Sequence, residues 1–305
     1  MPYEDGRKTE IVDLSDSTFE CTGLPDYPLN TKFGGGGLLA NNTPIICGGY
    51  NGTDIGECFK LIDKKWNPME DMMNEARNHA GYGNVVVNES LWKSGGVKFF
   101  GGEKFFDKLQ NSSELINGNT SLKYSDLPEA MYAHCSIQIN DSVILVTGGN
   151  SGNANKKTYY HNFKNGEWSD GPELLNARYM HACKSFYLNN EKTLVVAGGI
   201  GDEGKLKSVE FLSLEHEDKG WYSGNTTDLP EAMAEFSMVP SLDHKSVFAV
   251  GVVVGGKRDC ILELSCDGTN LDSCNWENSP TKLKHPRENL VALLIPDSLV
   301  DELCY

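Results

Sequence analysis

Long apolar runs are absent from the 305-residue chain. The longest, Val247 to Val254, suits one buried strand and falls far short of the roughly 18 apolar residues of a membrane-spanning helix. The sequence begins Met1-Pro2-Tyr3-Glu4-Asp5, which is polar and acidic and lacks a basic-plus-apolar leader, so we expect a signal peptide to be either removed or never present. No membrane span is predicted.

Basic residues are also scarce. Lys and Arg number 27 against 43 Asp and Glu, which gives a formal net charge of −16 at pH 7. A net acidic surface repels the phosphate backbone of nucleic acids and anionic lipid head groups. Nucleic acid and the bare membrane surface are therefore excluded as expected partners.

The common catalytic motifs are missing as well. The chain contains no nucleophile elbow, no Cys-x-x-Cys pair, no His-Glu-x-x-His and no phosphate-binding loop. We predict no catalytic residues and no cofactor, and the missing motifs favour a protein that is not an enzyme without deciding the question.

What is present is a repeat. Four apolar segments end in a glycine pair, and the first glycines of the pairs lie 47, 53 and 50 residues apart. A fifth, looser pair, Gly255-Gly256, follows Val250 to Val254. A period near 50 residues with a strand followed by two glycines is typical of a β-propeller. The four clear pairs are Gly48-Gly49, Gly95-Gly96, Gly148-Gly149 and Gly198-Gly199.

Each repeat predicts four antiparallel strands, A to D, with strand B ending in the glycine pair. Full blades are expected at about residues 33–77, 78–131, 132–178, 179–233 and 234–287. Residues 9–24 match strands C and D alone, and residues 289–305 match strands A and B alone. Joined, they would form a composite sixth blade that closes the ring. The sequence thus predicts one all-β domain over residues 1–305, a six-bladed propeller.

The passages between repeats alternate. Two end in Ala-Arg, at Arg77 and Arg178, and two end in Ala-Met, at Met131 and Met233. Equivalent residues lie 101 and 102 residues apart. This alternation indicates duplication of an ancestral pair of blades.

Several of these features together resemble kelch-repeat proteins, from about residue 9 to the C-terminus. An arginine shortly before a histidine matches that family in Arg178-Tyr179-Met180-His181 and, one residue shorter, in Arg77-Asn78-His79. The chain is most similar to single-domain secreted kelch proteins of invertebrates, and it lacks the adaptor domains that recruit ubiquitin ligases. The glycine pairs match too, as do the aromatic residues and tryptophans Phe59, Tyr160, Phe211, Trp66, Trp168, Trp221 and Trp276.

Nine cysteines predict disulfide bonds and a secreted, extracellular protein. Cys47 and Cys58 lie on strands expected to be neighbours, and Cys266 and Cys274 flank a C–D turn. Cys21 and Cys304 both belong to the composite blade, although strand C is expected between them. Cys135 and Cys183 are expected to be buried free thiols, and Cys260 has no evident mate. An odd number leaves at least one thiol free or bonded to another chain.

Sequons for N-glycosylation support the same history, with seven in the chain. The sequon at Asn41 is weakened by Pro44. The six other candidates are Asn51, Asn88, Asn111, Asn119, Asn140 and Asn225.

Three histidines are weak candidates for a metal site. His79, His134 and His181 are predicted at equivalent places at the start of strand A, which lines the central channel, so their imidazoles could converge on an ion. Because repeats place identical residues at equivalent positions anyway, a packing role is the alternative.

A second candidate site is the face that carries the B–C and D–A loops. The B–C connection of the second blade contains two Lys-Phe-Phe units, with Phe99, Phe100, Phe105 and Phe106. Exposed aromatic residues tend to mark an interface, whereas packing of these rings onto the propeller is the alternative. The same face should hold Tyr50, Asp54, Arg77, Arg178 and Arg287.

Three hypotheses of function follow. The first is a secreted, non-enzymatic binding propeller that engages a protein, a glycan or a small apolar ligand through the B–C and D–A loops. The second is an enzyme or metal protein at the channel mouth that uses the three histidines. The third is a self-assembling structural subunit, which would form a homo- or hetero-oligomer.

Overall fold

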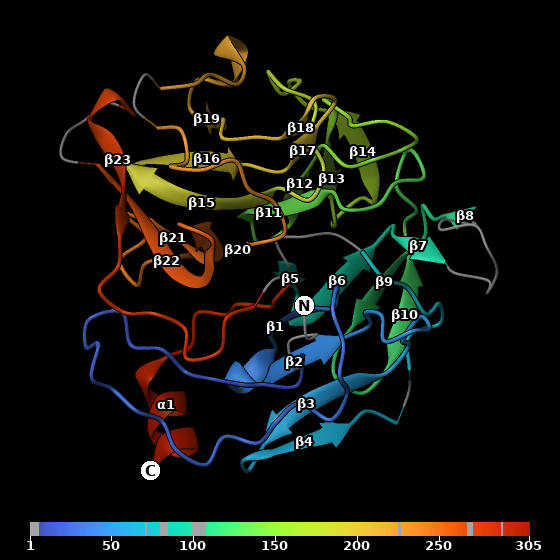
Figure 1. Cartoon of the computed structure of the whole chain (residues 1–305). Coiled ribbons are helices and arrows are strands. Elements are labelled where there is room, and N and C mark those ends of the chain that lie inside the picture. Colours follow the sequence, from blue (N-terminus) through green and yellow to red (C-terminus); the bar gives the residue numbers. More distant parts are fainter. Residues whose placement is uncertain are drawn as a thin grey trace.

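Each apolar segment that ends in a clear glycine pair forms the second strand of its own β-sheet. The computed structural model describes residues 6–70, 72–79, 85–98, 108–224, 227–266, 271–287 and 289–305. Within them, five sheets radiate from a common axis, which makes the protein an all-β propeller (Figure 1). Innermost strands of neighbouring sheets contact one another in the order β1, β5, β11, β15 and β20.

All five sheets are antiparallel, and the first, second, third and fifth have four strands. The fourth contains three, and Tyr222 pairs with Phe211 beyond its outer edge. The strands are β1 (Gly35–Leu38), β2 (Pro44–Cys47), β3 (Cys58–Ile62) and β4 (Lys65–Pro68); β5 (Val85–Val87), β6 (Ser90–Ser94), β9 (Ser113–Ile116) and β10 (Ser121–Tyr124); β11 (Cys135–Asn140), β12 (Val143–Thr147), β13 (Thr158–Asn162) and β14 (Glu167–Asp170); β15 (Ala182–Leu188), β16 (Glu191–Ala197) and β19 (Val209–Ser213); and β20 (Ser237–Pro240), β21 (Val247–Val254), β22 (Lys257–Cys266) and β23 (Cys274–Asn278).

Two short hairpins and three 3₁₀ turns lie between these strands. The hairpins extend B–C connections, and the only α-helix of the described residues, α1, lies near the C-terminus. The hairpins are β7 (Val97–Lys98) with β8 (Lys108–Leu109) and β17 (Ile200–Gly201) with β18 (Gly204–Lys205); the turns are η1 (Ala40–Asn42), η2 (Glu217–Lys219) and η3 (Leu271–Ser273); and α1 spans Asp297–Cys304.

Strand direction divides the connections between two faces. Because the strands of a blade run alternately up and down, the B–C and D–A connections lie at one end, which we call the mouth face. The A–B and C–D turns lie at the other end, which we call the back face.

The glycine pairs join each blade to the passage that leads into the next one. The amide of Gly149 donates to the carbonyl oxygen of Arg178 at 2.9 Å, and the amide of Gly199 donates to that of Met233 at 2.8 Å. Gly148 has φ +57°, and an added Cβ would lie 2.9 Å from Cε1 of His181. Close approach and a left-handed backbone together require glycine here.

The fifth pair has a different role. Gly255-Gly256 forms the turn of a hairpin between β21 and β22. Gly251, with φ +79°, takes the place of the pair instead, since an added Cβ there would meet Leu290 and the carbonyl of Arg287. Gly255-Gly256 thus follows strand B, as expected, but it does not make the close approach to the next passage that the four clear pairs make.

Four tryptophans fill the wedges between blades. Each indole N–H donates to the blade or segment that precedes it, at 2.9–3.3 Å. Aromatic rings supply large apolar area and a polar N–H that needs a partner when buried. The donor and acceptor residues are Trp66 and Pro25, Trp168 and Ser125, Trp221 and Pro172, and Trp276 and Thr227.

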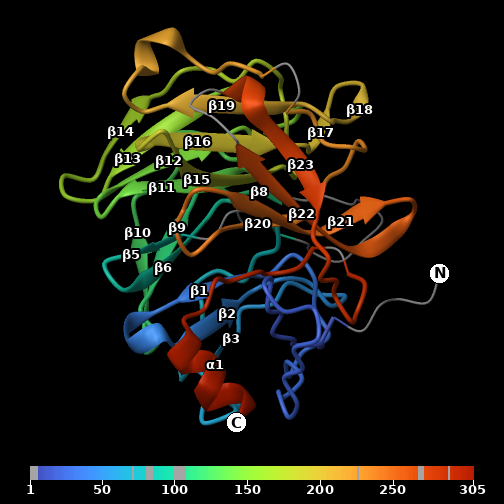
Figure 2. The same cartoon turned by 90° about the vertical axis from the view of Figure 1, so that its left-hand side faces the viewer.

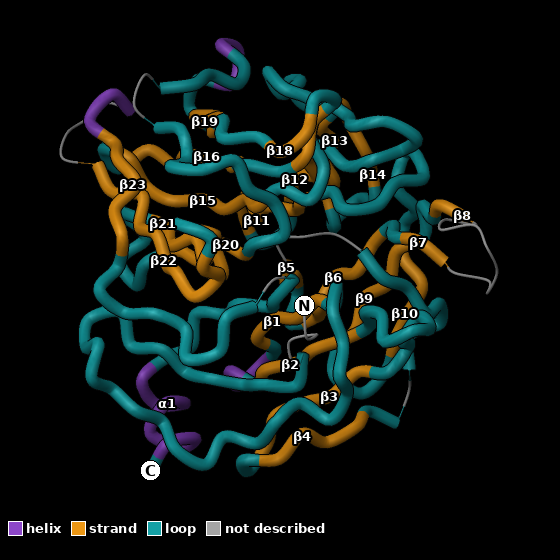
Figure 3. Tube along the Cα trace, in the orientation of Figure 1, coloured by secondary structure: helices purple, strands orange, loops and turns teal. Residues whose placement is uncertain are grey.

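The predicted sixth blade is not a β-sheet. Of the segments assigned to it, residues 9–24 and 289–295 form no strand, and α1 replaces the expected strand B (Figure 3). Asp13 and Asp16 draw local backbone amides into turns: Asp13 Oδ1 accepts from Ser15, and Asp16 Oδ1 accepts from Thr18. Such turns compete with strand pairing.

The two terminal segments nevertheless lie side by side between the β20–β23 sheet and the β1–β4 sheet (Figure 2). We call this sector, filled by residues 7–32, 279–287 and 289–305, the terminal seam. Leu299 and Leu303, one turn apart on α1, pack against Leu61 of β3. Thr281 Oγ1 donates to the carbonyl of Asp13 at 3.1 Å. The seam thus closes on side chains rather than on a sheet.

Four disulfides are formed, of which three match the predicted pairs. These are Cys21–Cys304, Cys47–Cys58 and Cys266–Cys274. The fourth, Cys135–Cys183, links the innermost strands of two neighbouring blades, so the expectation of free thiols there is wrong. Those strands lie next to each other around the axis, which brings the two Cα atoms to 6.1 Å. Cys260 is free and buried.

No helix of the described residues is long and apolar enough to cross a membrane.

Candidate functional site

The entrances to the innermost strands form a ring at the mouth face. At each entrance one residue has a positive φ, and five of the six such residues are joined in succession by backbone hydrogen bonds. Ala133 donates to His79, Met180 to Ala133, Glu235 to Met180 and Asn289 to Glu235, at 2.8–3.0 Å. Such bonds from blade to blade require the blades to converge at the axis. The positive-φ residues are Phe33, His79, Ala133, Met180, Glu235 and Asn289.

Four rings line about half of this mouth. Phe33 stacks on His79 with centroids 3.6 Å apart, His79 meets Tyr132 edge-on at 5.9 Å, and Tyr132 meets Tyr179 at 5.9 Å. We call these four residues, one from each of four consecutive blades, the aromatic arc. Phe33 and Tyr179 are half-buried, whereas His79 and Tyr132 are 7% and 8% exposed. Edge-to-face contacts of this kind stabilise aromatic pairs.

Polar groups lie beside the arc. Asp54 Oδ1 accepts a hydrogen bond from Asn78 Nδ2 at 2.5 Å, and Asn78 Oδ1 contacts His79 Nδ1. Lys32 Nζ lies 5.3 Å from the centroid of the Phe33 ring. Tyr50 exchanges two backbone hydrogen bonds with Lys32. The predicted site residues Tyr50 and Asp54 are therefore at the mouth.

Burial sets the protonation of His79. Desolvation, with a smaller contribution from the charge of Lys32, lowers the pKa of His79 to about 3. The imidazole is thus neutral near pH 7. It can accept or donate a hydrogen bond but carries no charge toward a ligand.

The three histidines do not form a metal site. His79 occupies the position of Ala133 and Met180, one residue before that of His134 and His181. His134 Nε2 pairs with Ser94 Oγ at 3.0 Å, and His181 Nε2 pairs with Thr147 Oγ1 at 2.9 Å. Both are fully buried between blades. In the described part of the chain no group of three or more His, Cys, Asp or Glu could hold an ion.

The prediction that the three histidines occupy equivalent places is wrong because two passages of the sequence differ in length. The passage from Arg77 to His79 is one residue shorter than the passage from Arg178 to His181. The shorter passage places the histidine at the mouth rather than under it. Phe236 takes the buried position in the fifth sheet, since its ring lies against Gly198 as the ring of His181 lies against Gly148.

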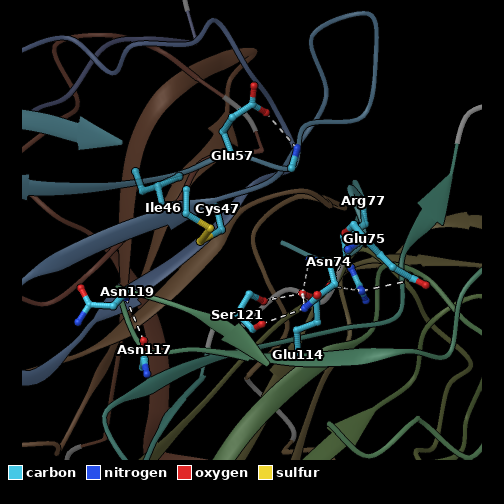
Figure 4. The surroundings of a disulfide bond; sticks show 12 residues. Ile46, Cys47, Glu57, Asn74, Glu75, Arg77, Glu114, Asn117, Asn119 and Ser121 are labelled. Atoms are coloured by element: carbon cyan, nitrogen blue, oxygen red, sulfur yellow. Dashed lines mark hydrogen bonds and ion pairs between the residues drawn. A yellow bond between two sulfur atoms is a disulfide. The ribbon is translucent and has the colours of Figure 1, made fainter. Parts of the chain in front are cut away.

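Arg77 and Arg178 do not reach the mouth surface. Their exposures are 1% and 0%. Arg77 donates to Glu114 of the next blade at 2.7 Å (Figure 4). Arg178 donates to Glu210 of the next blade at 2.5 Å, and we call each such contact between a passage and the blade after it a joint. Their predicted role in partner binding is therefore wrong, and they hold blades together instead. The sequence pattern does not reveal this structural role, because it does not show that the two arginine side chains are buried.

Each carboxylate in these joints is also held by backbone amides. Glu114 accepts from the amides of Asn74 and Glu75. Desolvation by burial would raise the pKa of Glu114, but the Ser121 hydroxyl, the charge of Arg77 and the hydrogen bonds from Asn74 outweigh it, so the pKa is lowered. Arg77 also donates to the carbonyls of Gly95 and Ser112. The pair is thus fully hydrogen-bonded, as a buried ion pair must be.

Arg287 repeats this joint at the terminal seam. Its guanidinium donates to Glu10 at 2.6 Å and to the carbonyl of Lys8 at 2.6 Å. Glu10 also accepts the amide of Lys284, as Glu114 accepts that of Asn74. The Arg287 side chain is 21% exposed, so this pair is less buried than the others.

The predicted loop aromatics Phe99, Phe100, Phe105 and Phe106, and the sequon residue Asn225, lie outside the described residues.

Comparisons with known proteins agree on the fold. No family model matches the chain. The N-acetylneuraminate epimerase of Salmonella enteritidis PT4 is 26% identical over 214 residues, which are 64% of this chain. The chain matches only 54% of that relative's length. The solved structure entitled "Structure of YjhT" aligns with a TM-score of 0.67 at 13% identity, covering 84% of this chain and 86% of that one. This likeness shows the propeller fold.

Proposed function

We propose that the protein is a secreted binding propeller that holds a small polar ligand of the sugar class at the aromatic arc. The observation that supports this proposal most strongly is the aromatic arc, with Lys32 and Asp54 beside it. Binding sites typically combine aromatic walls with a few placed polar groups. A sugar ring offers an apolar face to stack on an aromatic ring and hydroxyls for the polar groups.

Charge supports an acidic sugar within this class. The chain carries −16 overall, so an anionic ligand needs a local cation, and exposed Lys32 supplies one at the mouth. The relative's name adds N-acetylneuraminate, an acidic sugar, as the first ligand to try.

Titration calorimetry with N-acetylneuraminate tests this proposal. Replacement K32Q should weaken binding roughly tenfold, since one charged contact is worth on the order of 1.4 kcal/mol. Replacement Y179A should weaken it further by removing one wall of the arc. The control K64Q changes a half-buried lysine in the β3–β4 turn on the back face and should leave the affinity unchanged. Absence of binding at millimolar ligand, or equal effects of K32Q and K64Q, would refute the proposal.

An epimerase is the second candidate. It is favoured by the relative's name and by the chain of contacts from Asp54 through Asn78 to His79, which offers a carboxylate and a neutral imidazole as proton carriers. Proton NMR of N-acetylneuraminate would follow the interconversion of its epimers. Faster interconversion that D54N slows would support catalysis. A rate equal to that without protein would leave binding alone.

We also propose a six-sector, kelch-type ring in which the terminal seam replaces a blade. Support comes from Asn289 and Phe33, which complete six left-handed entrance residues, and from the Arg287–Glu10 pair. Trp66 likewise donates to Pro25 of the seam as other tryptophans donate to a preceding blade. An experimental structure with five sheets closed directly on each other would contradict it. Four disulfides support the secreted location.

A further inference from the structure

The sequons are distributed unevenly between the two faces. Asn88 lies in the turn between β5 and β6, Asn119 in the turn between β9 and β10, and Asn140 at the turn between β11 and β12. All three turns belong to the back face, and all three asparagines are exposed. In Figure 4, the turn that holds Asn117 and Asn119 lies at the opposite end of the second sheet from Arg77. Asn51 and Asn111 lie on B–C connections, on the mouth face.

The three back-face asparagines differ from many others in the hydrogen bonding of the side-chain amide nitrogen, Nδ2. Nδ2, the atom that would carry a glycan, donates no hydrogen bond in Asn88, Asn119 or Asn140 within the described residues. By contrast, Nδ2 of Asn67 donates to Lys65, that of Asn74 to Glu114, and several non-sequon asparagines behave alike: Asn78, Asn155, Asn165 and Asn176.

In Asn140 and Asn119 the oxygen of the same amide accepts a hydrogen bond instead. Asn140 Oδ1 accepts the amide of Ser142, the third residue of its own sequon, at 2.9 Å. Asn119 Oδ1 accepts from Lys60 Nζ at 3.3 Å. A substituent on Nδ2 would keep these bonds and would break none, whereas losing a net hydrogen bond costs about 1 kcal/mol. The turns therefore tolerate a glycan at no cost to the fold.

We propose that the back face of the second and third blades is the glycan-bearing face, with N-linked glycans on Asn88, Asn119 and Asn140. N-linked glycans are bulky and solvated. They would prevent a flat protein interface from forming there and leave the mouth face as the accessible one. The inference needs passage through the secretory pathway but not the sugar ligand proposed above.

Glycopeptide mapping of the protein purified from its own source tests this directly. Enzymatic release of N-glycans converts each modified asparagine to aspartate, which mass spectrometry locates. We expect conversion at Asn88, Asn119 and Asn140. Two or more of these three remaining asparagine, or conversion confined to Asn51 and Asn111, would overturn the proposal.

Variants secreted from insect cells give a second measurement. N88Q and S90A disrupt one sequon by different routes and should remove the same mass, that of one glycan. N140Q should remove another. The control N153Q changes an exposed asparagine outside any sequon and should leave the mass of the glycans unchanged. Equal masses for wild type and N88Q would contradict a glycan at that site.

Discussion

Two versions of one joint can be compared in this molecule. The Arg178–Glu210 pair joins two regular sheets and is fully buried, whereas the Arg287–Glu10 pair makes the same contacts at the terminal seam, where neither partner lies in a strand. Both arginines donate to a carboxylate and to a backbone carbonyl two residues before it. The joint therefore depends on side-chain placement and not on strand pairing. What differs is the protection from water and the number of other bonds around it.

The largest effect is expected from opening the terminal seam. The double variant C21S/C304S removes a bridge between residues 283 apart, which in the chain-entropy model contributes as much as about 5 kcal/mol to the free energy of unfolding. The seam has no sheet to hold it, so α1 and residues 7–24 should exchange amide hydrogens before the sheets do. Hydrogen-exchange mass spectrometry measures this order.

The matched control is C135S/C183S. That bridge spans 48 residues and joins strands that are already paired within their own sheets. Its loss should cost somewhat less, about 4 kcal/mol, and should not expose the seam first. Seam amides that stay protected in C21S/C304S would show that the side chains alone close the ring.

The second effect comes from breaking the buried joint. R178M leaves Glu210 buried without its cation, which should lower the free energy of unfolding by about 3–5 kcal/mol. The double variant R178M/E210L copies the joint between Met233 and Leu262, which share one apolar cluster, and should recover at least half of the loss. Denaturant titration measures both. A double variant no better than R178M would mean that the two kinds of joint are not interchangeable.

A third prediction concerns the buried histidines beside these joints. Burial lowers the pKa of His134 to about 3, below the usual value of about 6.5 in an unfolded chain. Its contribution to stability is therefore fully present above pH 6.5 and is lost as the pH falls from 6.5 toward 3. From pH 7 to pH 5 this amounts to about 2 kcal/mol.

The variant H134F, which copies Phe236 of the fifth sheet, should remove that part of the acid sensitivity. Denaturant titration at pH 7 and pH 5 compares it with wild type and with H216F at an exposed histidine. An unchanged pH dependence in H134F would show that other groups govern acid unfolding.

The smallest effect is expected from R287M. Its side chain is 21% exposed and that of Glu10 is 11% exposed, so water solvates whatever remains. We expect a loss of about 1 kcal/mol, as for exposed ion pairs. A loss of unfolding free energy as large as that of R178M would show that the seam excludes water as fully as a joint between sheets does.

Much of the ring was predictable because its signals are local. The glycine pairs mark close backbone approaches, and the tryptophans mark wedges. Cys47–Cys58 followed from strand adjacency, Cys266–Cys274 from the turn that its cysteines flank, and Cys21–Cys304 from the expected meeting of the two chain ends. The absence of a sixth β-sheet could not be predicted from the strand pattern. Asx turns at Asp13 and Asp16 compete with strand formation in the N-terminal segment, and the spacing of Leu299 and Leu303 favours a helix in the C-terminal one. The candidate site was only half predictable: Tyr50 and Asp54 lie at the mouth, but the arc of Phe33, His79, Tyr132 and Tyr179 joins residues far apart in the chain.

The sequence by itself determined the period, the strands and the alternation of arginine and methionine joints, since each depends on residues a few positions apart. Only the tertiary structure decided which side chains the joints bury. It buried Arg77 and Arg178, paired Cys135 with Cys183, and showed that the one-residue difference in passage length places His79 at the mouth and His134 below it. The physical reason is convergence at the axis: where blades meet, a shift of one residue exchanges a buried position for one at the mouth.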